Sequence, residues 1–245
     1  MTIPRFHLPC VRPGSTDLPE TALIHATRVL RLQEGDALRV FDAGLEFGAT
    51  IVAIAKHRVR IEVGEEVASL PERTIPLHLI MSPLKGDLTE LVIQKATELG
   101  VSRISPVAFE RTDTVARRDP GEVRKGRWHR VATSAAEQSG RTVVPAIDSP
   151  TTLRQAVDAL GAPRDHEARI VAAEPSLDQD NRRAPGDSRT VRSLVVAVGP
   201  AGGLTESDLT VLRSAAFTPQ RLAVHTLRSE TACIAAVAIL GDRFR

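Results

Sequence analysis

From residue 77 onward, short apolar segments alternate with segments of helical periodicity. Parallel strands need a crossover connection, usually a helix, so this alternation predicts an α/β fold with a mostly parallel sheet covered on both faces. The expected strands lie at 77–82, 103–109, 142–147, 168–173, 193–198 and 221–226. The expected helices lie at 87–100, 121–138, 151–160, 205–216 and 229–240.

The segment 87–100, "DLTELVIQKATELG", carries the clearest helix signal in the chain. Asp87 is expected to cap this helix, with Glu90 three residues later in a capping-box arrangement, and Gly100 is expected to end it. Helical periodicity predicts one buried face, made of Leu88, Leu91, Val92, Ala96 and Leu99.

Residues 1–70 have a different pattern, in which a short helix at 21–32 precedes β-rich sequence. Short branched segments separated by turn signals predict strands at 37–41, 48–55 and 58–63. Prolines and charges then mark a linker. We therefore expect three parts, a β-rich domain (1–70), a linker (71–76) and an α/β domain (77–245). Within the last part, the polar stretch 176–192 is expected to be a mobile loop.

The composition excludes several classes of protein. No apolar run approaches the ~20 residues of a membrane-spanning helix, and the first residues lack the apolar core of a signal peptide. The two cysteines, Cys10 and Cys233, cannot make a disulfide framework and have no zinc-type partners nearby in sequence. We therefore expect a cytoplasmic protein with reduced thiols, no membrane contact and no metal.

A glycine-rich loop, "VGPAGGLT", connects the expected strand 193–198 to a helix that Thr205 and Asp208 are placed to cap. Ligands of parallel sheets bind beyond the carboxyl ends of the strands, and glycines there let the backbone approach a ligand closely. The glycine spacing fits neither a P-loop nor the dinucleotide fingerprint. Taken alone, the loop is either a ligand site or a tight strand-to-helix turn with no ligand.

A second loop of the same kind lies in "RLAVHTLRSETACIAAVAIL", residues 221–240. The helix expected there is small and apolar nearly all round, which is typical of a helix buried against another helix or subunit. Arg228 and Glu230 therefore fall at the mouth of the sheet and are candidates for the site. The alternatives are a surface arginine and a carboxylate favourably placed at a helix N-terminus.

Taken together, "VGPAGGLTESDL" and "LRSETACIAAVAIL" resemble the C-terminal signature of the RsmE family, the 16S rRNA uridine N3-methyltransferases of the SPOUT superfamily. Three further stretches agree, "LKGDLTELVIQKATELGV" (84–101), "ERTDTV" (110–115) and "RWHRVATSAAEQSGR" (127–141). The segment 25–42 resembles the PUA-like RNA-binding domain that precedes the catalytic domain in that family. The resemblance covers nearly the whole chain, in order.

The resemblance implies a SPOUT-type parallel sheet with a trefoil knot, a preceding PUA-like domain, and a homodimer whose active site is completed near the subunit interface. It also implies that S-adenosylmethionine (SAM) binds between the two loops, and that a uridine of 16S rRNA in the small ribosomal subunit is methylated. The implied cofactor-binding residues are Gly199, Pro200, Gly202, Gly203, Leu222 and Leu227. Two positions depart from the family pattern, Ala201 in place of the usual glutamate and His225 in place of the usual arginine.

The implied reaction needs few protein groups, because the methyl group of SAM is already activated and can be aligned without a metal. Uridine N3 carries a proton, so the nucleophile should be the deprotonated anion, which Arg228 would stabilise. Glu230 would orient Arg228, or act as the base if burial raised its pKa. Orientation is favoured, because a carboxylate beside arginine usually stays ionised.

The segment 111–130 contains seven basic and three acidic residues. Such a run is ordinarily a solvated helix face, but a positive patch also supplies sequence-independent affinity for phosphates. Trp128 within it either stacks on a base or packs in the core. The candidate RNA contacts are Lys85, Arg111, Arg124, Lys125, Arg127, Arg130 and Arg141.

Two other functions stay open. The chain is a SPOUT enzyme that acts on another RNA, or it is a catalytically inactive RNA-binding or ribosome-assembly protein, which Ala201 and His225 would suit. A nucleotide-dependent oxidoreductase is disfavoured, because the G-x-G-x-x-G motif and a suitably placed acid for a ribose are missing.

Overall fold

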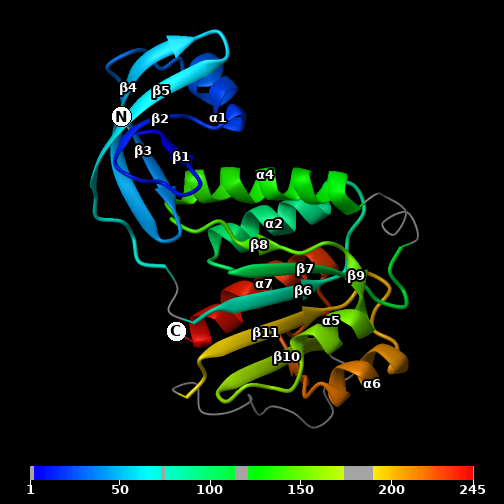
Figure 1. Ribbon diagram of the computed structural model, residues 1–245. Coiled ribbons are helices and arrows are strands. Elements are labelled where there is room, and N and C mark those ends of the chain that lie inside the picture. The colour runs from blue at the N-terminus through cyan, green and yellow to red at the C-terminus, as the bar shows by residue number, and fades with distance from the viewer. Residues whose placement is uncertain (1–2, 73–74, 114–120, 174–189, 245) are drawn as a thin grey trace. The chain divides into compact units, whose positions relative to one another are not determined.

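The computed structural model describes residues 3–72, 75–113, 121–173 and 190–244 (Figure 1). The chain divides into two compact units. The N-terminal unit contains residues 1–72 and 133–144, and the C-terminal unit contains residues 73–132 and 145–245. The segment 133–144, expected in the α/β domain, is therefore part of the N-terminal unit. Most of the polar stretch 176–192 lies outside the described residues.

The N-terminal unit is built on a five-stranded sheet with the order β1-β3-β4-β5-β2. Its elements are β1 (Arg5–His7), β2 (Gly14–Asp17), α1 (Glu20–Ile24), the π-helix η1 (His25–Val29), β3 (Ala37–Asp42), β4 (Leu45–Ala55) and β5 (Arg58–Glu66). Alternate residues of β5, Val59, Ile61 and Val63, are buried, which gives the sheet one apolar face. The three predicted strands are present, whereas β1 and β2 have too few branched residues to be predicted.

The segment 133–144 is bound into the N-terminal unit by Arg5. The guanidinium donates to Glu46 Oε1 at 2.8 Å and to the carbonyl oxygens of Ala136 and Glu137, each at 3.1 Å. A third nitrogen donates to the Arg141 carbonyl at 3.0 Å. The last carbonyls of a helix have no partner within the helix, so this arginine acts as a C-terminal cap.

Arg141 also belongs to this framework, which corrects its place among the candidate RNA contacts. The residue is only 9% exposed, and its Nη2 donates to Glu72 Oε2 at 2.8 Å. The Glu72 carboxylate also accepts from the backbone nitrogens of Thr142 and Val143. A buried arginine whose donors are committed to a neighbouring carboxylate is not available to phosphates, so we remove Arg141 from the RNA-binding set.

The C-terminal unit contains a parallel sheet with the order β12-β10-β11-β6-β7-β8, which confirms the predicted α/β fold (Figure 1). Its strands are β6 (Leu77–Met81), β7 (Arg103–Ala108), β8 (Ala146–Ile147), β9 (Thr151–Thr152), β10 (Glu167–Ala173), β11 (Ser193–Val198) and β12 (Thr218–Arg221). Its helices are α2 (Leu88–Glu98), α5 (Leu153–Leu160), α6 (Glu206–Ser214) and α7 (Ser229–Arg243), and α4 (Gly121–Ser139) runs across both units.

Helices cover both faces of this sheet. Side chains of α5 and α6 share a core with Ile80, Val107 and Val195. On the other face, α7 contacts β6, β11 and α2. The central strands are therefore buried on both sides, which explains why their sequences are continuous apolar runs. In the part of the chain that the structure describes, no helix is long and apolar enough to span a membrane.

Two predicted strands were wrong in extent. The strand expected at 221–226 is in fact β12, Thr218–Arg221, and the apolar residues after it form an irregular loop. The sequence of β12, TPQR, is polar and contains a proline, which a strand tolerates at the edge of a sheet. The strand expected at 142–147 is reduced to β8, because residues 142–144 belong to the N-terminal unit.

The helix predicted at 87–100 is present as α2, and of its predicted buried face Val92 and Ala96 are buried but Leu88 and Leu91 are not. The buried residues are Thr89, Val92, Ile93, Ala96 and Thr97. Leu88 and Leu91 are each 37% exposed. Both stripes recur at helical intervals, so periodicity alone could not choose between them. Asp87 makes no side-chain cap, and its carboxylate instead accepts from Arg127 Nη2 at 3.3 Å.

A chain of polar side chains crosses β6 and β7 on the face covered by α5. Ser105 donates its only hydroxyl proton to the Asp148 carboxylate, so His78 Nε2, 2.6 Å from Ser105 Oγ, must be the donor to that oxygen. Burial, followed by the positive charge of Arg103, lowers the pKa of His78 to about 4, although the charges of Asp148 and Glu167 act in the opposite direction. The native protein therefore keeps His78 neutral.

Neutral His78 makes stability depend on pH. The pKa of His78 is about 6.5 in the unfolded chain and about 4 in the native protein. Between these values the unfolded chain binds a proton that the native state does not, so the protein becomes less stable as the pH is lowered from about 6.5 to about 4. Urea titrations near pH 5.5 should show that the unfolding free energy drops for each pH unit of acidification. This drop should be about 1 kcal/mol larger in the wild type than in His78→Gln. Equal slopes in the two proteins would contradict this assignment.

Candidate functional site

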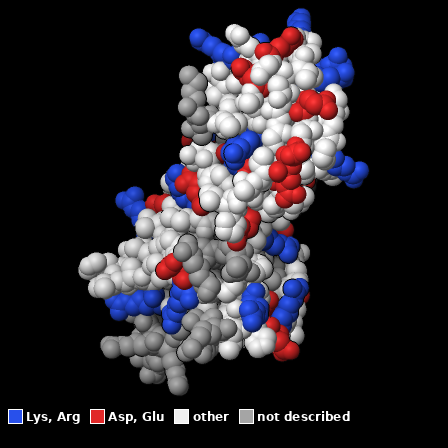
Figure 2. Space-filling model, turned by 90° about the vertical axis from the view of Figure 1, so that its left-hand side faces the viewer, with Lys and Arg blue, Asp and Glu red and all other residues white. Residues whose placement is uncertain are grey.

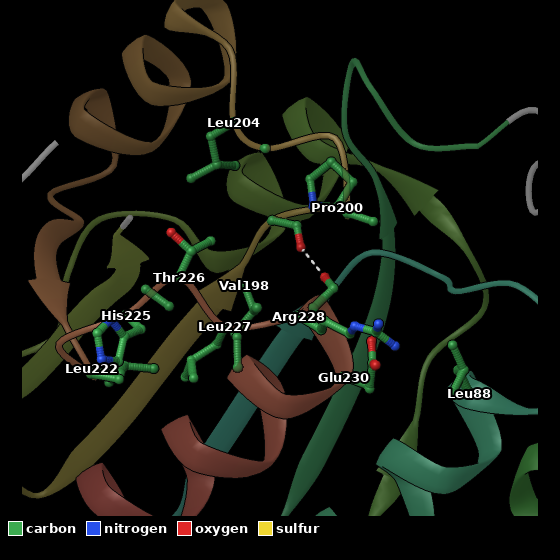
Figure 3. A pocket seen from close by; sticks show the side chains of 17 residues that line it. Leu88, Val198, Pro200, Leu204, Leu222, His225, Thr226, Leu227, Arg228 and Glu230 are labelled. Carbon is green, nitrogen blue, oxygen red and sulfur yellow. Dashed lines mark hydrogen bonds between the residues drawn. The ribbon is translucent and has the colours of Figure 1, made fainter. Parts of the chain in front are cut away.

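Two loops at the carboxyl ends of the sheet enclose a cavity of about 460 Å³ (Figure 3). The glycine loop (199–204) follows β11, and the final loop (222–228) follows β12. Both loops lie where ligands of parallel sheets bind. The lining residues come from these loops, from strand ends, and from the first turns of α2 and α7: Leu88, Ala172, Val198, Gly199, Pro200, Ala201, Gly203, Leu204, Leu222, Ala223, His225, Thr226, Leu227, Arg228, Ser229, Glu230 and Ala232.

The glycine loop is a tight turn in which two positions exclude a side chain. The Gly203 nitrogen donates to the Pro200 carbonyl at 2.9 Å, and Gly203 has a φ of +77°, a left-handed conformation that favours glycine. A Cβ on Gly199 would lie 2.8 Å from two carbon atoms of Leu204. The loop is thus a tight turn that also forms one wall of the cavity.

Both ends of the glycine loop are fixed by helix N-termini. At one end, Thr205 caps α6 with Asp208 in a reciprocal capping box, as predicted. At the other end, the buried Ser229 donates from Oγ to the Gly199 carbonyl at 2.6 Å (Figure 3). Ser229 is the first residue of α7, so this hydrogen bond joins the glycine loop directly to the final loop and its helix.

The start of the final loop is held by Arg221, the last residue of β12. Arg221 donates from Nε to the Ala223 carbonyl at 2.7 Å and from Nη2 to the Val224 carbonyl at 2.6 Å. Leu222 and Leu227 follow as lining residues, in agreement with their predicted position. His225, which departs from the family pattern, is exposed and also lines the cavity.

Arg228 and Glu230 stand at the entrance of α7, where the sequence placed them. Arg228 occupies the N-cap position with an extended backbone, and Glu230 lies in the first turn. Both side chains line the cavity, as does Leu88 (Figure 3). Burial, and then the charge of Glu230, raise the pKa of the Cys233 thiol one turn further along, so this cysteine is an inert core residue.

Several lining residues were not predicted from the sequence. Leu88 was assigned to the buried face of α2, yet it reaches the cavity end that Arg228 and Glu230 occupy (Figure 3). Ser229 lies between those two residues in the sequence. A hydroxyl side chain at the start of an apolar helix was the one sequence feature that could have indicated its contact with the glycine loop. Gly202, which was predicted to bind the cofactor, is not among the residues that line the cavity. It lies against Arg111, whose Cβ would be 3.2 Å from a Cβ added at Gly202.

The candidate RNA contacts in the C-terminal unit are mostly engaged with other residues. Lys85 Nζ lies 2.8 Å from Asp113 Oδ2, and the hydrogen bond and charge of Asp113 raise the pKa of Lys85. Arg127 Nε lies 2.7 Å from Glu90 Oε1, which replaces the capping role expected of Glu90. On the face drawn in Figure 2, basic and acidic residues likewise intermingle.

The remaining members of the basic run differ in exposure. Arg130 is exposed, and Lys125 donates from Nζ to Ser149 Oγ at 3.3 Å. Trp128 is only 3% exposed, so it packs in the core and does not offer a stacking surface. Arg117, Arg118 and the side chain of Arg124 lie outside the described residues. In the described residues, no cluster of three or more potential metal ligands is found.

Residues 71–241, which include this sheet, its glycine loop and the cavity, match the family model of the RNA methyltransferase domain. A second model, the RNA methyltransferase PUA domain, matches residues 19–64. The class of the protein is therefore that of the RNA methyltransferases.

Individual relatives narrow the class. Ribosomal RNA small subunit methyltransferase E of Synechocystis sp. is 32% identical over 225 residues, covering 89% of this chain and 70% of that protein. The Bacillus subtilis protein of the same name is 30% identical, covering 89% and 86%. The solved structure of the Neisseria gonorrhoeae enzyme bound to S-adenosyl methionine superimposes with a TM-score of 0.84 at 31% identity, covering 98% of each chain. The chain belongs to the ribosomal RNA small subunit methyltransferase E family, RsmE, which confirms the resemblance.

The geometry of the glycine loop predicts opposite effects for two glycine-to-alanine substitutions. Gly203→Ala forces a left-handed conformation on alanine and should lower the unfolding free energy by about 1 to 2 kcal/mol. Gly126→Ala, inside α4 with open space around it, should raise this free energy by about 0.5 to 1 kcal/mol. Urea unfolding followed by circular dichroism measures both, and a change of the same sign in both variants would contradict the loop geometry.

Proposed function

We propose that this protein transfers the methyl group of SAM to N3 of a uridine in 16S rRNA of the small ribosomal subunit. The observation that carries the proposal is the cavity between the glycine loop and the final loop, with Arg228 and Glu230 at one end. The similarity to proteins named ribosomal RNA small subunit methyltransferase E, and to an enzyme solved with S-adenosyl methionine, supports it.

The cavity fits such a cofactor in size and in chemistry. Its volume of about 460 Å³ lies within the range of small-molecule pockets, roughly 300 to 1,000 Å³. Its walls combine aliphatic side chains, including Leu204, Leu222 and Leu227, with glycine backbone that no Cβ shields. We propose that Gly199, Pro200 and Gly203 offer backbone groups to the cofactor, while the leucines pack on its adenine.

The bound cofactor would supply a methyl group on a sulfonium, which needs only alignment with its acceptor. Within this chain, we propose that Arg228 stabilises the negative charge of the deprotonated uridine N3. Glu230, in the first turn of the helix that Arg228 caps, would orient the Arg228 side chain. Transfer would form the N3–CH₃ bond as the S–CH₃ bond breaks, release S-adenosylhomocysteine, and leave the N3 proton to be taken up by water.

Four further features belong to this proposal. The N-terminal unit, residues 1–72 and 133–144, forms the RNA-binding domain, and the C-terminal unit, residues 73–132 and 145–245, forms the catalytic domain. The catalytic domain carries a trefoil knot, which the meeting of the two loops around one cavity supports. The protein is a homodimer, which the exposed Leu91 and Ile239 on α2 and α7 support. A ribosomal RNA substrate also implies that the enzyme acts in the cytoplasm.

The proposal is tested by methyl transfer from labelled SAM to small ribosomal subunits that lack the modification, followed by mass mapping of the nucleosides. The expected product is N3-methyluridine at one position of 16S rRNA. Methylation only of another RNA would identify a different SPOUT substrate. SAM binding by calorimetry without transfer to any RNA would identify a binding protein, and Ala201 and His225, both at the cavity, would be the residues to restore.

Arg228→Ala should lower kcat for methyl transfer by about 100-fold, the usual loss when one donor to a developing oxyanion-type charge is removed. The Kd for SAM, measured by calorimetry, should stay within about threefold, because backbone and aliphatic groups dominate the proposed contacts. Arg213→Ala, an exposed arginine on α6, is the matched control. Wild-type turnover in Arg228→Ala would remove Arg228 from the mechanism.

Phosphate binding by the basic run is tested with a double charge reversal, Lys125→Glu with Arg130→Glu. RNA affinity should fall, and the slope of log K against log salt should decrease by roughly one to two, about 0.9 for each phosphate that is no longer neutralised. Arg154→Glu with Arg164→Glu, two exposed arginines elsewhere in the C-terminal unit, makes the same change in net charge. An equal decrease in affinity in both double variants would show that only total charge matters.

A further inference from the structure

The turn that follows β7 (109–113) contacts the outer side of the glycine loop. Arg111 donates from Nη1 to the Gly202 carbonyl at 3.0 Å. The aliphatic stem of Arg111 also covers Gly202, because a Cβ at that glycine would lie 3.2 Å from the Arg111 Cβ and 3.6 Å from its Cδ. The other residues of the loop, Gly199 to Ala201 and Gly203, line the cavity. Arg111 therefore holds the loop from the side that faces away from the cavity.

The neighbouring residue, Glu110, holds the next part of the same loop. Its carboxylate accepts from Thr205 Oγ1 at 2.6 Å, and its backbone nitrogen donates to Asp208 Oδ1 at 3.2 Å. Thr205 and Asp208 are the two members of the α6 capping box. Consecutive residues of the turn thus contact Gly202 and the helix N-terminus that follows it.

The turn is itself anchored to the core of the sheet. The Phe109 nitrogen donates to Thr112 Oγ1 at 2.8 Å, and this hydroxyl lies 3.0 Å from Ser82 Oγ, directly after β6. Ser82, Phe109 and Thr112 are all buried. A turn fixed in this way provides a rigid support for a glycine-rich segment that has few side chains of its own to hold it.

We infer that Arg111 is a positioning residue for the cofactor loop and not a contact to RNA phosphate. The inference rests on the proposed function, because it takes the cavity as the SAM site. By fixing the Gly202 carbonyl, Arg111 keeps the turn from Pro200 to Gly203 in the conformation that borders the cavity. Its planar guanidinium supplies the hydrogen bond, and its stem supplies the packing.

The experiment separates the hydrogen bond from the packing. Arg111→Met keeps an aliphatic stem and removes the donors, whereas Arg111→Lys keeps one donor, and Arg213→Ala is the control arginine. The Kd for SAM should rise about three- to tenfold in Arg111→Met, as expected when one hydrogen bond is removed, and Arg111→Lys should recover part of it. Hydrogen exchange without SAM should become faster at the amides of Gly199 and residues 201–205 in Arg111→Met, with α5 unchanged.

The affinity for small-subunit RNA tests the alternative, that Arg111 binds a phosphate. If Arg111 bound a phosphate, Arg111→Met would lower the slope of log K against log salt by about 0.9 and leave SAM binding and loop exchange unchanged, which would overturn the inference. An Arg111→Met protein with wild-type SAM affinity and exchange would overturn it as well. If the wild type bound no SAM, the proposed function would fail, and exchange in the ligand-free proteins would still decide whether Arg111 holds the loop.

Discussion

The hydrogen bond from Ser229 Oγ to the Gly199 carbonyl joins the two loops on which the site depends. Gly199 begins the glycine loop directly after β11, and Ser229 begins α7, 30 residues later. Because Ser229 is buried, removal of its hydroxyl would leave the carbonyl without this partner, at a cost of about 1 to 3 kcal/mol. This hydrogen bond holds a glycine turn and a helix N-terminus together at the edge of the sheet where the cavity lies.

The glycine loop is supported from three directions. Ser229 holds its start, the capping box of Thr205 holds its end, and Arg111 holds its outer surface. A segment with few side chains cannot order itself, since glycine loses more conformational freedom on folding than any other residue. The surrounding elements supply that order, which leaves the inner side of the loop free for a ligand.

For the basic residues, tertiary contacts decide which positive charges are available to a phosphate and which are already paired. Arg141 and Arg127 look alike in the sequence, as members of one positive region near α4. In the fold, Arg141 is buried against Glu72, and Arg127 pairs with Glu90. These carboxylates lie tens of residues away in the chain, so a local count of charges could not reveal that the arginines were already paired. Arg130, in contrast, is exposed, and for this residue the phosphate contact stays a prediction.

The sequence by itself determined the parallel sheet, the capping box at Thr205, the position of the glycine loop and the place of Arg228 and Glu230 at the start of α7. These features depend on period, caps and chain order, which act over a few residues. Only the tertiary structure decided which stripe of α2 is buried, where β12 lies, and that Leu88, Ser229 and Arg111 belong to the site. Each of these depends on which distant segment packs alongside. A helix with two apolar stripes buries the one that meets its neighbours, and an arginine donates to whichever acceptor the fold brings near it.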